Sequence, residues 1–187
     1  MRAWRDFFPE VLPFIADGMP DPLLERHVLR VAQRFCERTR AWRATLEPIA
    51  TLAGATNYEM ELPQQAGLVR LEHALLDGVE LSLGRADPRC QGRFVSTSDR
   101  KTVDLGFTPI ATQALVLTAS LKPANGAQGL EDFLFDQYAE DIAAGAVARI
   151  NNDPLAREAF EQRCDAVATQ LWRGSAAIRP RAVAHYF

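Results

Sequence analysis

The chain has 187 residues, of which 48% are hydrophobic and 24% are charged, and its formal net charge is −3. This length and composition suit one globular domain that buries a core without disulfide staples. The acidic balance argues against nucleic-acid binding by the whole surface. No run of about 18 apolar residues predicts a membrane span, and Pro9 and Pro13 break the apolar start that a signal peptide would need. We therefore expect synthesis in a reducing cytoplasm.

Residues 1–20 alternate bulky apolar residues with helix breakers, and we expect them to pack on the protein's helices or on a neighbouring subunit. The main helix is expected over residues 21–42, with Asp21 as its N-cap and Pro22 at the first helical position. Its apolar residues recur at helical spacing. These are Leu24, Val28, Val31, Phe35 and Trp42.

Four arginines stand four residues apart on the other face of this helix, and we call them the arginine ridge. They are Arg26, Arg30, Arg34 and Arg38. Like charges at this spacing oppose helix formation by roughly 0.2–0.5 kcal/mol per pair. Either water and salt screen the ridge, or acidic groups lie against it.

Between residues 43 and 122 the apolar period changes from 3.6 to 2, which predicts six or seven strands. Asp77-Gly78 is a strong signal for a two-residue hairpin, and a second hairpin is expected to turn near Ser98-Asp99. Because no helix separates the strands, we expect an antiparallel sheet. The alternating residues include Tyr58 and Met60; Val69, Leu71, His73 and Leu75; and Leu115, Leu117, Ala119 and Leu121.

The helical period returns at Leu130 and predicts a helix that ends near Asn151-Asn152. The face opposite its apolar residues carries an acidic row, defined as Asp132, Asp136 and Glu140. A last helix is expected to begin at Asp153-Pro154 and to end at Gly174. Its narrow apolar seam consists of Phe160, Cys164, Val167 and Leu171.

These elements predict an α+β protein. Residues 1–42 and 123–187 are expected to form a helical bundle with a C-terminal arm, and residues 43–122 an inserted antiparallel β lobe. The arm, residues 178–187, is expected either to dock on another protein or to be a disordered end. Its candidate contact residues are Ile178, Arg179, Arg181, Tyr186 and Phe187.

The chain contains no phosphate-binding loop, dinucleotide motif, zinc-protease motif or nucleophile elbow. Cys36, Cys90 and Cys164 are odd in number and widely spaced, which disfavours a disulfide framework or a zinc site. His27 is more readily a packed or rim histidine than a ligand. We therefore expect no catalytic residue, no cofactor and no metal. The alternatives are a hydrolase that uses an Asp/Glu pair and a monomeric binding module.

The arginine ridge and the acidic row have two interpretations. Charge runs are usually solvated helix faces. Alternatively, the two surfaces complement each other, within one subunit or between copies of a ring. Helix geometry allows contact within one subunit only near Arg38, so most pairing would occur between subunits.

The opening WRDFFPEVLPFIADGMPDPLLERHVLRVAQRFCERTRAW is similar to the N-terminus of tailed-bacteriophage head–tail adaptor (connector) proteins. Four further segments resemble the same family in the same order along nearly the whole chain. They are EPIATLAGATNYEMELP, LVRLEHALLDGVEL, LTASLKP and FLFDQYAEDIAAGAVARI. We do not match the GRADPRC loop or the RPRAVAHYF tail to this family.

This resemblance implies a virion structural protein that is assembled in the host bacterial cytoplasm and needs no membrane. Such adaptors form a ring, typically twelvefold, that joins the portal protein to the tail tube or tail completion proteins. DNA passes through the lumen without sequence-specific binding during packaging retention and ejection. An acidic chain is compatible with this role, because a lumen that binds phosphates weakly lets DNA slide.

Overall fold

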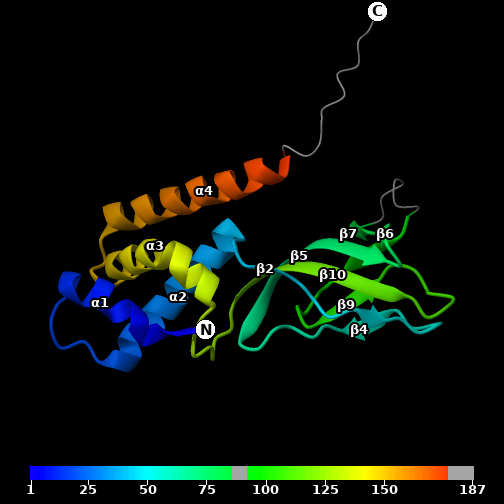
Figure 1. The fold of residues 1–187 in the computed structure, drawn as a ribbon, viewed down its shortest axis with the longest axis horizontal. Helices are drawn as coiled ribbons and strands as arrows, with labels where there is room; N and C mark the ends of the chain where they lie inside the picture. The colour runs from blue at the N-terminus through cyan, green and yellow to red at the C-terminus, as the bar shows by residue number, and fades with distance from the viewer. Residues whose placement is uncertain (86–91, 177–187) are drawn as a thin grey trace, which may run out of the picture.

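The computed structural model describes residues 1–85 and 92–176 of the chain. It is a mixed α and β protein whose strands pair in mainly antiparallel sheets. Figure 1 shows an elongated molecule with the helices gathered at one end and the longer strands at the other. No helix in the described part of the chain is both long and apolar enough to cross a membrane.

The N-terminal segment folds onto the helices of its own chain. Its elements are β1 (Arg2–Ala3), the 3₁₀ helix η1 (Trp4–Phe7), α1 (Phe8–Val11) and the 3₁₀ helix η2 (Leu12–Phe14). β1 pairs antiparallel with β11 (Gly129–Leu130), a pairing that the sequence did not indicate. Trp4, Phe7 and Val11 are buried. Phe7 packs edge-on against Phe135 with 4.8 Å between ring centroids, so the packing predicted for this segment occurs within one chain.

The main helix, α2 (Asp21–Thr39), ends three residues before the predicted boundary, because Arg40 adopts a left-handed conformation with φ 53°. The prediction of Asp21 as the N-cap is wrong. Asp21 is the first helical residue, and the N-cap is Pro20. Trp42 lies beyond the helix but is buried at 6% exposure. The predicted apolar face is otherwise confirmed, and its buried residues are Leu24, Val28, Val31 and Phe35.

The two C-terminal helices are α3 (Asp132–Ile150) and α4 (Pro154–Ala176), and both pack against α2 and against each other. Asp153 caps the N-terminus of α4, which begins at Pro154 as predicted. Its Oδ1 accepts hydrogen bonds from the backbone N–H groups of Leu155 at 2.9 Å and Ala156 at 3.1 Å, which satisfies free donors of the first turn. The predicted end at Gly174 is wrong, since the helix continues to Ala176.

The strands form two larger sheets besides the β1-β11 pair. One has the order β2-β10-β5-β6, with β3 also paired to β10, and the other has the order β4-β9-β8-β7. The strands are β2 (Arg43–Thr45), β3 (Ile49–Ala50), β4 (Asn57–Glu59), β5 (Ala66–Leu76), β6 (Val79–Glu80), β7 (Ser82–Leu83), β8 (Phe94–Ser96), β9 (Thr102–Leu105) and β10 (Ala114–Pro123).

Two of the strand predictions need correction. The set Val69, Leu71, His73 and Leu75 does not form one face of β5, because the register with β10 shifts twice and leaves Val69 and Glu72 without a partner in β10. Each extra residue moves the following side chains to the other face. The buried residues of β5 are therefore Leu68, Leu71, Ala74 and Leu76.

The sheet is also not wholly antiparallel, because β7 and β8 pair in parallel. The pairing spans two residues of each strand and is joined by residues 84–93, of which 86–91 lie outside the described residues. The expectation rested on the helical crossover that usually connects full parallel strands, and this pairing is only two residues long.

Both predicted hairpins are confirmed. Asp77 and Gly78 have positive φ angles of 49° and 80° between the paired residues of β5 and β6, as a type I′ turn requires. Asp99 stabilises the second turn, because its Oδ1 accepts backbone N–H groups of Lys101 at 2.9 Å and Thr102 at 2.8 Å. These hydrogen bonds lower the pKa of Asp99.

Candidate functional site

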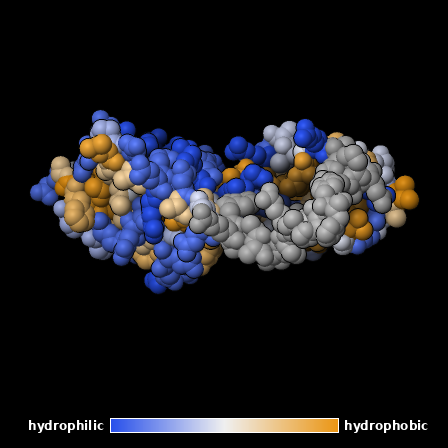
Figure 2. All heavy atoms as spheres, turned by 90° about the horizontal axis from the view of Figure 1, so that it is seen from above, coloured by the Kyte–Doolittle hydropathy of each residue, from blue (hydrophilic) through white to orange (hydrophobic). Residues whose placement is uncertain are grey.

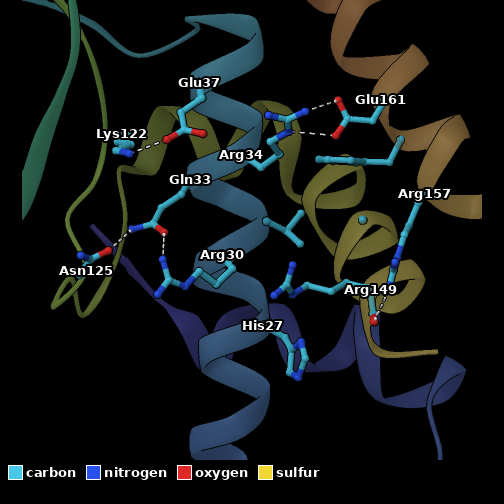
Figure 3. Close-up of a pocket in the computed structure, with 13 residues that line it drawn as sticks. His27, Arg30, Gln33, Arg34, Glu37, Lys122, Asn125, Arg149, Arg157 and Glu161 are labelled. Atoms are coloured by element: carbon cyan, nitrogen blue, oxygen red, sulfur yellow. Dashed lines mark hydrogen bonds and ion pairs between the residues drawn. The ribbon is translucent and has the colours of Figure 1, made fainter. Parts of the chain in front are cut away.

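A hollow lined by many charged side chains lies between α2, α3 and α4, and we call it the cationic groove (Figure 3). Its volume is about 710 Å³. The lining residues are His27, Arg30, Val31, Gln33, Arg34 and Glu37 of α2; Lys122 and Asn125; Gly145 and Arg149 of α3; and Arg157, Phe160 and Glu161 of α4.

Gly145 brings the three helices of the groove close together. A Cβ atom at this position would lie 2.7 Å from the Phe160 ring and 2.7 Å from Cγ1 of Val31. Both neighbours are packed side chains of other helices, so a larger residue would push α2 or α4 away from α3. The spacing of the arginines across the groove therefore depends on a glycine in α3.

Half of the arginine ridge is paired within the chain, and its partners come from α4. Arg34 forms a bidentate pair with Glu161, with Nε to Oε1 at 3.0 Å and Nη2 to Oε2 at 3.2 Å. Arg38 contacts Glu161 at 3.3 Å and also bonds to Asp165. Glu161 raises the pKa of Arg34 through this hydrogen bond.

This pairing corrects one part of the prediction. We expected pairing within one subunit only near Arg38 and expected the acidic row of α3 to supply the carboxylates. The partner of Arg34 and Arg38 is α4, which packs on α2 beside the ridge and presents Glu161 and Asp165 one turn apart.

The other half of the ridge has no carboxylate partner among the described residues. Arg30 donates from Nη1 to Oε1 of Gln33 at 3.3 Å. Gln33 is buried and is itself held by the Pro123 carbonyl at 3.0 Å and by Asn125 Oδ1 at 3.1 Å. Arg30 is thus oriented at the groove by a neutral network, as Figure 3 shows. Arg26 is exposed one turn earlier.

Two arginines that the sequence analysis missed complete the groove. Arg157 donates to Asn152 Oδ1 at 2.7 Å and to the Arg149 carbonyl at 3.4 Å. The Arg149 side chain points toward α2 in Figure 3. Lys122 is neutralised by Glu37, and Arg34 by Glu161. Arg30, Arg149 and Arg157 therefore remain without an acidic partner in the described chain, and they make the groove positive on a protein of negative net charge.

His27 lies at one end of the cationic groove, and the positive charge of nearby arginines affects its pKa. Its Nδ1 is buried and has no hydrogen-bond partner within the described residues. The pKa of His27 is lowered, first by burial and then by Arg149 and Arg26. His27 is therefore neutral at pH 7, which agrees with the prediction of a packed or rim histidine.

The lowered pKa of His27 predicts a pH-dependent stability. The unfolded chain binds a proton at His27 near its ordinary pKa of 6.5, whereas the folded chain binds it only at lower pH. Stability is therefore lost as the pH falls below 6.5, and the loss stops below the folded pKa. We expect the melting temperature to fall more between about pH 7.5 and 5.5 for the wild type than for His27→Gln. Equal slopes for the two proteins would contradict this assignment.

The acidic row lies apart from the ridge within one chain. Asp132 binds the Met1 amino group at 2.8 Å and approaches Arg2 at 3.6 Å, and the amino group lowers its pKa. Asp136 and Glu140 are exposed and make no ion pair within residues 1–85 and 92–176. Pairing of the ridge with this row in another subunit stays a prediction. The arm residues Ile178, Arg179, Arg181, Tyr186 and Phe187 lie outside the described residues.

The two carboxylates that line the groove, Glu37 and Glu161, are each paired with a cation of the same chain. Cys36 and Cys164 are buried, and burial raises the pKa of both thiols to about 12. The described residues contain no cluster of metal-binding side chains. The arrangement is suited to binding an anionic surface.

No protein-family model matches this chain, and no curated protein is significantly similar to it.

Proposed function

We propose that the protein is a head–tail adaptor of a tailed bacteriophage and forms a ring between the portal protein and the tail. Three kinds of partner follow: further copies of the chain, the portal, and the tail tube or tail completion proteins. In this proposal the helices form one bundle into which residues 43–122 are inserted as a β lobe. DNA passes through the lumen, and the protein has no catalytic step.

The observation that carries the proposal is the separation of two unpaired charged surfaces on one chain. Arg30, Arg149 and Arg157 have no acidic partner in the described residues, and Asp136 and Glu140 have no basic one. Different surfaces that complement each other produce head-to-tail contacts, and such contacts close into rings when the rotation permits. The similarity of the ordered sequence segments to head–tail adaptors supports the same conclusion.

Particle mass in solution tests the proposal. The protein is measured by light scattering alone and after mixing with its cognate portal. We expect a ring, or a complex that contains portal and several copies of the chain. A protein that is monomeric alone is still consistent with assembly on the portal. A protein that remains monomeric at every concentration and does not bind the portal would contradict the proposal.

A further inference from the structure

A second hollow, which we call the apolar groove, lies where η2, the C-terminal half of α3 and the first turns of α4 meet. Its volume is about 490 Å³, within the range of about 300–1,000 Å³ that is typical of ligand pockets. Figure 2 shows apolar side chains gathered at this helical end of the molecule. The lining residues are Glu10, Phe14, Glu140, Ala143, Ala144, Val147, Ala148 and Ala156.

The apolar groove exposes surface that a monomer would be expected to cover. The side chain of Phe14 is 65% exposed, although aromatic residues nearby in the N-terminal segment are buried. The floor consists of alanines and a valine from α3, so an incoming side chain can approach the helix backbone closely. The exposed ring of Phe14 beside this hollow offers apolar surface to a partner.

Two carboxylates at the apolar groove favour a positively charged occupant. Oε2 of Glu10 is buried and has no hydrogen-bond partner in the described part of the chain. A buried polar atom without a partner costs free energy, so a donor from the ligand would remove this penalty. Glu140 is exposed at the same groove and makes no ion pair within residues 1–85 and 92–176. The occupant should therefore combine apolar side chains with cationic donors.

We propose that the occupant is the arm, residues 178–187, of a second copy of this chain. The arm has the required chemistry, because Arg179 and Arg181 can donate to the two carboxylates while Tyr186 and Phe187 fill apolar surface. The inference deepens the proposed ring, on which it rests, by naming one contact between copies.

The length of the chain favours an arm that comes from another copy. Ala156 lines the groove, and α4 then carries the chain from this point to Ala176, a distance of about 30 Å at 1.5 Å per residue. Arg181 follows Ala176 by five residues, which span at most about 18 Å when fully extended. A chain therefore cannot place Arg179 or Arg181 at the Ala156 end of its own groove.

A labelled synthetic peptide with the sequence IRPRAVAHYF tests the proposal by fluorescence anisotropy against the full chain. Ala144→Trp fills the groove at an exposed position of α3, and Ala166→Trp is the matched control at an exposed position of α4 outside the lining. We expect the peptide to bind the wild type and Ala166→Trp equally. We expect binding to Ala144→Trp to be at least ~10-fold weaker.

Charge reversal identifies the paired groups. A peptide with Arg179→Glu and Arg181→Glu should lose binding to the wild type and regain part of it with Glu140→Arg. Absence of peptide binding, or equal binding to Ala144→Trp and Ala166→Trp, would overturn the inference. Loss of portal binding in Ala144→Trp without any peptide binding would overturn it as well, because the groove would then be a portal site.

The result is separable from that of the proposed function. If the peptide binds and Ala144→Trp blocks this binding, but the protein does not bind the portal, the result would support arm binding in the apolar groove and contradict the proposed adaptor function. Ring or portal-complex formation that is unchanged by Ala144→Trp, with no peptide binding, would support the adaptor and reject the groove.

Discussion

Replacing Phe35 with alanine is expected to lower the free energy of unfolding by about 3–5 kcal/mol. Phe35 is fully buried in α2, and its ring centroid lies 4.9 Å from that of Tyr138 in α3. The substitution removes most of the side chain from the α2-α3 contact and leaves a cavity that the packed helices cannot fill. Because the chain has 187 residues, a loss of this size lowers the melting temperature by roughly 10 °C.

Denaturant unfolding of the wild type and Phe35→Ala gives the measurement, and Phe14→Ala is the matched control. Phe14 has the same side chain but is 65% exposed, so its removal should change the free energy of unfolding by less than about 0.5 kcal/mol. Similar losses in the two variants would contradict the burial of Phe35 described here.

Local sequence patterns predicted the elements whose form is set by nearby residues. The buried face of α2 follows from residues three and four apart, and Asp77-Gly78 specifies its turn through the conformations that these two residues tolerate. In β10 the four predicted inward residues are completely buried, and they are Leu115, Leu117, Ala119 and Leu121. In each case the signal and the structural requirement lie within the same short stretch of chain.

The features that were missed depend on contacts between distant segments. The two register shifts of β5 exist only relative to β10, so the apolar spacing of β5 alone gave the wrong face. Likewise, β1 and β11 are two-residue strands separated by most of the chain. No pattern within a two-residue strand identifies its partner.

The candidate site also combines local features with contacts between distant segments. The arginine ridge was visible because its spacing is local. Glu161 and Asp165 stand four apart in α4 and give the same kind of signal as the acidic row of α3. The choice between the two acidic sets depends on how the helices cross. Arg149 and Arg157 reach the groove from different helices, and only the packing around Gly145 brings them together.

Reversing the charge of the unpaired half of the ridge is expected to abolish formation of the proposed ring. Arg26 and Arg30 have no carboxylate partner in the described chain, whereas Arg34 and Arg38 are already engaged by α4. Arg26→Glu with Arg30→Glu therefore alters the surface without breaking an ion pair inside the subunit. A single exposed pair contributes only about 0–1 kcal/mol. Reversal replaces attraction by repulsion at every interface of the ring, so the small terms add.

Light scattering of the assembled protein gives the measurement, and Arg100→Glu with Lys101→Glu is the charge-matched control. Arg100 and Lys101 are exposed in the turn before β9, away from the helices that line the cationic groove. The control should assemble normally if the position of the charge matters, and should fail equally if only net charge matters.

A compensating change tests the partner. Asp136 is exposed on α3 and makes no ion pair in the described residues. Adding Asp136→Arg to the reversed ridge should restore assembly in part, because the new arginine faces the introduced glutamates of the next copy. Unchanged assembly after ridge reversal would indicate that the arginine ridge is a solvated helix face. Lost assembly without rescue would place its partner elsewhere, since reversing the true partner must recover part of the attraction.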